Sequence, residues 1–195
     1  SASYRYYFEY KNDNIQDFKI LNTSIIIYLF IIFFIGGLTI YFAKNWISAT
    51  LFSNEINSNL IFISFISGCF EYFITYFTAL LTAQLRSSLY SIIIFMRSIL
   101  RVVIAFYLIF AFSLTYMSLI YAIIITQGIL VVVLFIVNKN ILTIKFSISL
   151  FKKSLKFSYP NVLRLIIGLI NSSFDKIMLV KITGVVAPVG YYSIA

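Results

Sequence analysis

Five long apolar segments are the feature that most limits the folds open to this chain. They cover residues 22–43, 58–82, 89–112, 117–137 and 158–182. Each comes close to the roughly 20 residues that an α-helix needs to cross about 30 Å of hydrocarbon. A soluble core could not hide several such runs, and they lack the strand-period alternation of a membrane β-barrel. The sequence therefore predicts an all-α fold, a polytopic membrane helix bundle with five transmembrane helices.

The composition fits lipid as the solvent, because 62% of the residues are hydrophobic and only 11% are charged. Cys69 is the single cysteine and there is no histidine, so we expect no disulfide framework, metal site or cofactor. The net charge of +9 is scattered between the apolar segments, so nucleic acid is not an expected partner. The chain starts at Ser1 without a Met and ends in "GYYSIA", and we expect an internal fragment of a longer membrane protein.

The basic residues of the connectors predict the orientation in the membrane. Nine fall on one side: Arg5, Lys11, Lys19, Arg86, Lys139, Lys145, Lys152, Lys153 and Lys156. The other side holds Lys44 and, near a helix end, Lys181. Residues 1–21, 83–88 and 138–157 are therefore expected in the cytoplasm. We expect the amphipathic stretch in 138–157 to lie on the anionic leaflet, with a specific lipid or partner site as the alternative.

Polar residues share one face in two neighbouring spans. In the second span, at about 100° per residue, the face around Glu71 holds Ser64, Ser67, Gly68, Thr75, Thr78 and Thr82. In the third, one face holds Arg86, Tyr90, Arg97 and Arg101. Counted from the cytoplasmic helix ends, Glu71 lies about 16 Å deep, between Arg97 at about 13 Å and Arg101 at about 19 Å. This predicts a Glu71–Arg97/Arg101 cluster facing the bundle interior, although helix packing and a self-neutralising ion pair remain alternatives.

The last span begins near Pro160, which we expect in the first helical turn. One stripe along it holds Asn161, Arg164, Gly168, Asn171 and Asp175, whereas Lys176 and Lys181 are expected to snorkel to the interface. Three polar faces predict a hydrated, cationic cavity of the kind found in transporters or channels. The candidates for substrate contact are Arg97, Arg101, Arg164 and Asn171, and those for ion coupling are Glu71 and Asp175.

The two ends of the chain resemble polysaccharide flippases of the Wzx type, which move O-antigen or capsular repeat units and share a superfamily with multidrug (MATE) exporters. In the segment from 155 to 195 the matching residues are Pro160, Asn171, Ser172, Ser173, Asp175, Lys176, Gly184, Gly190, Tyr191 or Tyr192, Ser193 and Ala195. In the first loop they are Arg5, Tyr7, Glu9 and Tyr10. The middle of the chain matches only as apolar spans.

The resemblance implies two lobes of six helices each, with the five spans as helices three to seven. Residues 1–137 would end the N-terminal lobe, 138–157 would link the lobes, and 158–195 would start the C-terminal lobe. The implied substrate is an undecaprenyl-diphosphate-linked oligosaccharide, moved across a bacterial or archaeal plasma membrane by alternating access with H⁺ or Na⁺ coupling. A polysaccharide polymerase and a chain-length regulator are the implied partners.

Two other functions remain open on the sequence. A MATE-like drug or metabolite exporter would favour acidic residues in the cavity for cationic drugs, whereas this chain places more Arg than carboxylate there. An integral membrane enzyme of polysaccharide assembly would need a sizeable loop with clustered polar residues. The largest outer loop, 44–57, carries only Lys44 and Glu55 as charged residues, so we do not expect an enzyme.

Overall fold

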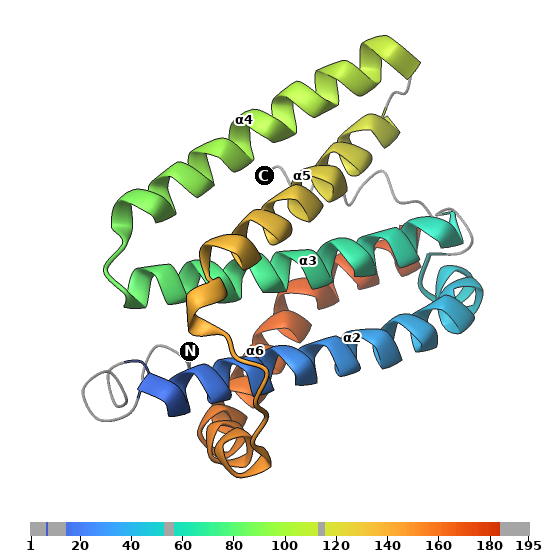
Figure 1. Ribbon diagram of the computed structural model, residues 1–195. Coiled ribbons are helices and arrows are strands. Elements are labelled where there is room, and N and C mark those ends of the chain that lie inside the picture. Colours follow the sequence, from blue (N-terminus) through green and yellow to red (C-terminus); the bar gives the residue numbers. More distant parts are fainter. Residues whose placement is uncertain (1–6, 8–14, 53–56, 113–115, 184–195) are drawn as a thin grey trace. The chain divides into compact units, whose positions relative to one another are not determined.

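The computed structural model describes residue 7 and residues 15–52, 57–112 and 116–183. All regular structure in these ranges is helical, without strands, as predicted (Figure 1). The elements are α2 (Ile15–Phe52), α3 (Ser58–Ala83), α4 (Ser87–Phe112), α5 (Tyr116–Val137), the short 3₁₀ helix η1 (Lys139–Ile141) and α6 (Ile148–Thr183).

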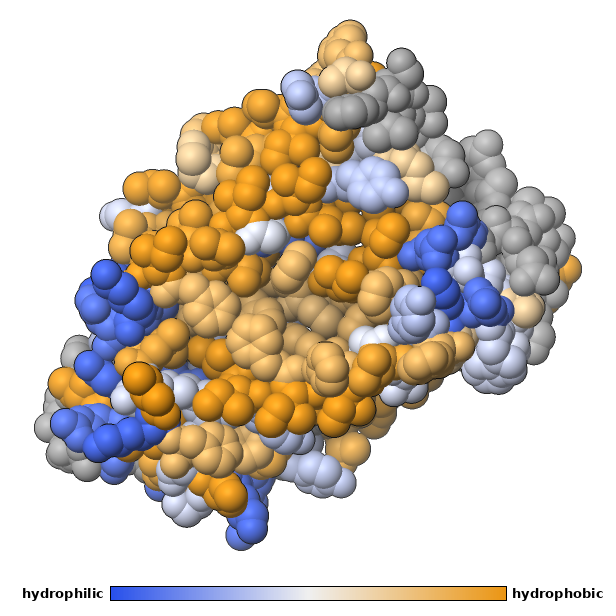
Figure 2. Space-filling view, turned by 45° about the vertical axis from the view of Figure 1, so that its right-hand side comes forward, coloured by the Kyte–Doolittle hydropathy of each residue, from blue (hydrophilic) through white to orange (hydrophobic). Residues whose placement is uncertain are grey.

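Four helices, α2 to α5, are long and apolar enough to cross a membrane. They carry the first four predicted spans. Large apolar side chains point outward from them: Phe42 of α2 is 79% exposed and Phe110 of α4 is 82% exposed. Orange, apolar residues make up most of the surface in Figure 2. Lipid is the solvent that such a surface requires, so the chain is a multi-pass membrane protein.

Three helix boundaries differ from the prediction. Helix α2 begins at Ile15, inside the loop expected at 1–21 and before the predicted start of the span at residue 22. Helix α2 continues past residue 43 to Phe52, because no Gly or Pro interrupts the outer connector. Helix α6 begins at Ile148, within the predicted linker, and runs through the expected boundary at 157 and 158. Pro160 therefore lies inside α6 rather than in its first turn, where it removes one backbone hydrogen bond. The fifth predicted span, 158–182, belongs to α6, is not among the four apolar helices, and stays a prediction.

The chain divides into two compact units, residues 1–29 with 66–152 and residues 30–65 with 153–195. In the first unit α4 packs along α5 (Figure 1). Phe77 of α3 is fully buried and meets Phe135 of α5 edge to face, with 4.7 Å between ring centroids. Asn22 of α2 accepts a hydrogen bond from the Tyr76 hydroxyl at 2.7 Å. These contacts join α2, α3 and α5 in the half of α3 that leads to the turn before α4.

In the second unit, the later part of α2 meets the beginning of α3. Gly36 leaves so little room that an added Cβ would lie 3.1 Å from the Phe65 ring, the close approach that small residues allow between membrane helices. Near the predicted outer end, Lys44 Nζ donates to Asn59 Oδ1 at 2.7 Å and lies 4.8 Å from the centre of the Tyr41 ring. These polar contacts hold the only basic residue of the 44–57 connector.

A tight turn connects α3 to α4 on the predicted cytoplasmic side. The N–H of Arg86 donates to the carbonyl of Leu81 and the N–H of Leu85 to that of Thr82, each at 3.0 Å. This is the Schellman pattern that satisfies the last carbonyls of a helix. It places Leu85 at a φ of 59°, in the left-handed region that favours glycine.

Leu85→Gly is therefore expected to stabilise the chain by about 0.5–1 kcal/mol, because it removes the Cβ strain at positive φ. The Leu85 side chain is 74% exposed, so little packing is lost. The free energy of unfolding in detergent is the measurement. Leu85→Ala is the control, since it shortens the side chain but keeps the strain. An equal gain in both variants would show that the backbone at residue 85 is not strained.

Candidate functional site

A carboxylate near the middle of the membrane is the centre of the candidate site. Glu71 lies 12 residues before the end of α3, Arg97 lies 10 residues after the start of α4, and Gln127 lies 10 residues before the end of α5. At 1.5 Å per residue, all three are about 15–18 Å from the helix ends that are predicted to be cytoplasmic. Half the thickness of the hydrocarbon core is about 15 Å, so the three groups meet near its midplane.

Arg97 holds Glu71 through two hydrogen bonds. Its Nη1 donates to Oε1 at 3.0 Å and its Nη2 donates to Oε2 at 2.6 Å. This bidentate geometry is the strongest that a guanidinium can offer a carboxylate. The side chains are 22% exposed for Arg97 and 40% for Glu71, so the pair is partly rather than fully buried.

Helix α5 completes this network. The Gln127 amide donates to Glu71 Oε2 at 2.9 Å, and the hydroxyl of Ser67 donates to Gln127 Oε1 at 2.8 Å. Both ends of the Gln127 side chain are thus bonded to α3, and Gln127 itself is buried. We call Ser67, Glu71, Arg97 and Gln127 the Glu71 network. It ties three helices at one depth.

The structure confirms the predicted approach of Glu71 and Arg97 but corrects the place of Arg101. Arg101 forms no hydrogen bond or ion pair with any residue that the structure describes, and its buried Nε has no partner. Arg97 takes both oxygens of Glu71 at once and Gln127 adds a third bond, so Glu71 obtains these hydrogen bonds without Arg101. Arg101 lies one turn further along α4 and is half-buried. It therefore remains as a positive charge that Glu71 does not neutralise.

The polar face of α3 is largely open in the described chain. Thr75 is exposed, and a Cβ added to Gly68 would meet nothing within 4 Å. Thr78 is the exception, since it is buried and bonds back to the carbonyl of Ile74 at 2.7 Å. On the same face Ser67 bonds to α5 and Glu71 to α4 and α5, so helix packing, the alternative left open on the sequence, accounts for only part of this face.

The remaining candidates lie on α6, in the second unit. Arg164 and Asn171 are exposed there. The side chain of Asp175 lies outside the described residues, so its role in ion coupling stays a prediction. No group of three His, Cys, Asp or Glu residues that could hold a metal ion occurs within the described ranges.

Sequence reasoning missed Gln127. It sits in the most apolar of the predicted spans, without a stripe of polar neighbours that would mark a face. Its isolation was the available signal, because a lone amide at membrane depth needs a hydrogen-bonding partner.

Comparison of the chain with protein-family models, curated proteins and solved structures gave no match.

A double-mutant cycle of Glu71→Ala and Arg97→Ala should give a coupling energy of about 1–2 kcal/mol. We expect less than for a fully buried pair, because both side chains keep some exposure. The measurement is the free energy of unfolding in detergent. The cycle of Glu71→Ala with Arg101→Ala is the control and should couple by about 0.5 kcal/mol or less. Equal coupling in the two cycles would contradict the assignment of Arg97 as the partner.

Gln127→Leu should destabilise the chain by about 1–2 kcal/mol, because it leaves the Ser67 hydroxyl without its acceptor and removes one of the two bonds to Glu71 Oε2. Thr126→Val is the matched control on the preceding residue. The Thr126 hydroxyl is buried without a partner, so its removal should be neutral or stabilising. Thermal or chaotrope unfolding of both variants measures the difference. A Gln127 variant as stable as the Thr126 variant would rule out the amide as a structural bridge.

Proposed function

We propose that this chain is part of a transporter that flips undecaprenyl-diphosphate-linked oligosaccharide repeat units from the inner to the outer leaflet for surface polysaccharide synthesis. It works by alternating access and is not an enzyme. The observation that carries the proposal is the excess positive charge at membrane depth. Glu71 neutralises Arg97, whereas Arg101 has no partner among the described residues.

A cation at this depth is costly unless it meets water, a counter-ion or an anionic ligand. A diphosphate suits Arg101 because guanidinium binds phosphate oxygens in pairs. The open polar face of α3 supports a hydrated side of the bundle next to these groups. The resemblance of the chain ends to repeat-unit flippases supports the choice of substrate. Arg164 and Asn171 are further contacts proposed for the glycan.

Glu71 is the proposed coupling group. While it is ionised, it fixes Arg97 by two hydrogen bonds. Binding of a proton, or of Na⁺, would weaken that pair and release Arg97 towards the substrate. The charge on Glu71 would thereby determine whether Arg97, in addition to Arg101, is available to bind the substrate. Asp175 on α6 is proposed as a second coupling group.

Arg101→Ala in the full-length protein should reduce surface polysaccharide by about tenfold or more, since charge-assisted bonds to phosphate are worth about 1.5–3 kcal/mol. The measurement is surface polysaccharide of the native cell, with protein level in the membrane checked in parallel. Arg97→Ala should have a similar effect on transport.

Arg86→Ala is the matched control, because Arg86 is exposed in the turn before α4 and lies outside the network. It should leave surface polysaccharide unchanged, and Arg101→Lys should restore part of it. Normal polysaccharide in Arg101→Ala would contradict the proposal. A change in drug susceptibility instead would favour the exporter of cationic drugs.

A further inference from the structure

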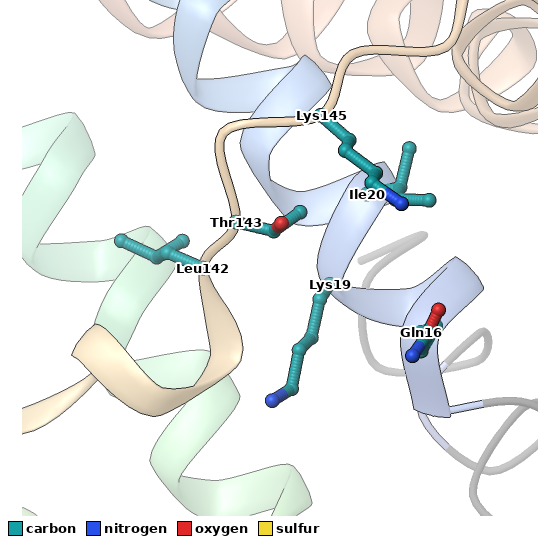
Figure 3. A pocket seen from close by; sticks show the side chains of 6 residues that line it. All are labelled: Gln16, Lys19, Ile20, Leu142, Thr143 and Lys145. Carbon is teal, nitrogen blue, oxygen red and sulfur yellow. The ribbon is translucent and has the colours of Figure 1, made fainter.

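A small pocket lies between the first turns of α2 and the segment that follows η1, both in the first unit (Figure 3). Its volume is about 240 Å³. The lining residues are Gln16, Lys19, Ile20, Leu142, Thr143 and Lys145. At about 30 Å³ per water, this is room for roughly eight waters. It is smaller than the usual small-molecule pocket and fits a compact polar group better than an oligosaccharide.

The segment that forms one wall is fastened to α2 by hydrogen bonds from its backbone N–H groups to hydroxyl side chains of the helix. The N–H of Thr143 donates to Thr23 Oγ1 at 2.9 Å, and the N–H of Ser147 donates to Ser24 Oγ at 3.0 Å. Ser24 is buried and in turn donates to the carbonyl of Ile20 at 2.8 Å. Two separate bonds therefore hold residues 143–147 against the helix, and they fix one wall of the pocket in place.

Each wall supplies one lysine. Lys19 comes from α2 and Lys145 from the fastened segment, and Figure 3 shows both side chains at the pocket. Neither ammonium group makes an ion pair or hydrogen bond with a residue in the described ranges. The acid nearest in sequence, Asp17, is two residues from Lys19 and so points to the opposite side of α2, where it has an interaction of its own. Gln16 and Thr143 add neutral hydrogen-bonding groups.

The depth of the pocket matches the lipid headgroups of the cytoplasmic leaflet. The continuous apolar run of α2 begins at Ile25, six residues or about 9 Å beyond Lys19. On the other wall, Leu142 follows the end of α5 at Val137 by only five residues. Two lysines without an ionic partner among the described residues, with neutral donors beside them, suit a singly or doubly charged anion rich in acceptor oxygens.

We propose that the Lys19–Lys145 pocket is a binding site for a phosphate group, carried by an anionic phospholipid or free in the cytoplasm. A phosphate bound in the pocket would contact both walls and hold residues 143–147 on α2, in addition to the two bonds to the Thr23 and Ser24 hydroxyls. The site is independent of the proposed transport function, because it uses none of the residues of the Glu71 network.

The lipid arm of the test titrates phosphatidylglycerol onto the purified full chain and measures the bound lipid by native mass spectrometry. Each lysine contributes about fivefold to the attraction of an anionic headgroup, so Lys19→Gln/Lys145→Gln should weaken binding roughly 25-fold. Lys139→Gln/Lys152→Gln is the matched control. It removes the same charge from exposed positions of the same region outside the pocket and should weaken binding clearly less than the pocket variant does.

The second arm distinguishes the source of the phosphate. Inorganic phosphate is added to the chain in phosphatidylcholine nanodiscs, and Tm is measured with and without it. A rise in Tm that the pocket variant lacks assigns the site to free phosphate. A rise with phosphatidylglycerol alone assigns it to lipid, and either result supports the proposal.

Lys19→Arg/Lys145→Arg guards against a variant that fails to fold, because it keeps both charges and should keep the binding. The proposal is overturned by unchanged phosphatidylglycerol binding together with an unchanged phosphate response in the glutamine pocket variant. Equal losses in the pocket and control variants would also overturn it, because the effect would then be a general attraction between charges.

Discussion

The carboxylate of Glu71 is the constraint on which the first unit depends. A charge near the membrane midplane has no bulk water to solvate it, so the protein must supply its hydrogen bonds. Arg97 supplies two and Gln127 a third, from two different helices. Helices α3, α4 and α5 therefore have to meet at the register where these side chains reach one another. A sliding of one turn would leave a charge or an amide without a partner.

Packing on the two sides of this network differs along α3. Between Phe73 and Ala83, towards the turn before α4, most side chains are buried, and the Phe77–Phe135 contact lies at the centre. Around Gly68, the helix is open. Burial therefore differs along α3, although the exposed Thr75 keeps part of the polar face open within the more buried stretch as well. The fastened segment at 143–147 adds a further polar tie at the closed end.

Much of the candidate site could be predicted from the sequence because it depends on depth and helical periodicity. Counting residues from the span ends was enough to predict that Glu71 and Arg97 lie at similar depths and close to each other. It could not choose between Arg97 and Arg101, since both lie within a few ångströms of the depth of Glu71. The choice depends on which guanidinium can take both carboxylate oxygens at once. Gln127 was missed because periodicity detects stripes, and a single amide makes none.

The sequence by itself determined that this chain is a helical membrane protein, because an apolar run of about 20 residues can satisfy its backbone hydrogen bonds in lipid as an α-helix. Only the tertiary structure decided which polar groups pair and where α2 and α6 extend beyond their spans. It also revealed the pocket between Lys19 and Lys145, two residues 126 positions apart in the chain. Hydropathy is a property of one segment at a time, whereas hydrogen bonds between helices depend on side chains from distant segments meeting at the right angle and distance.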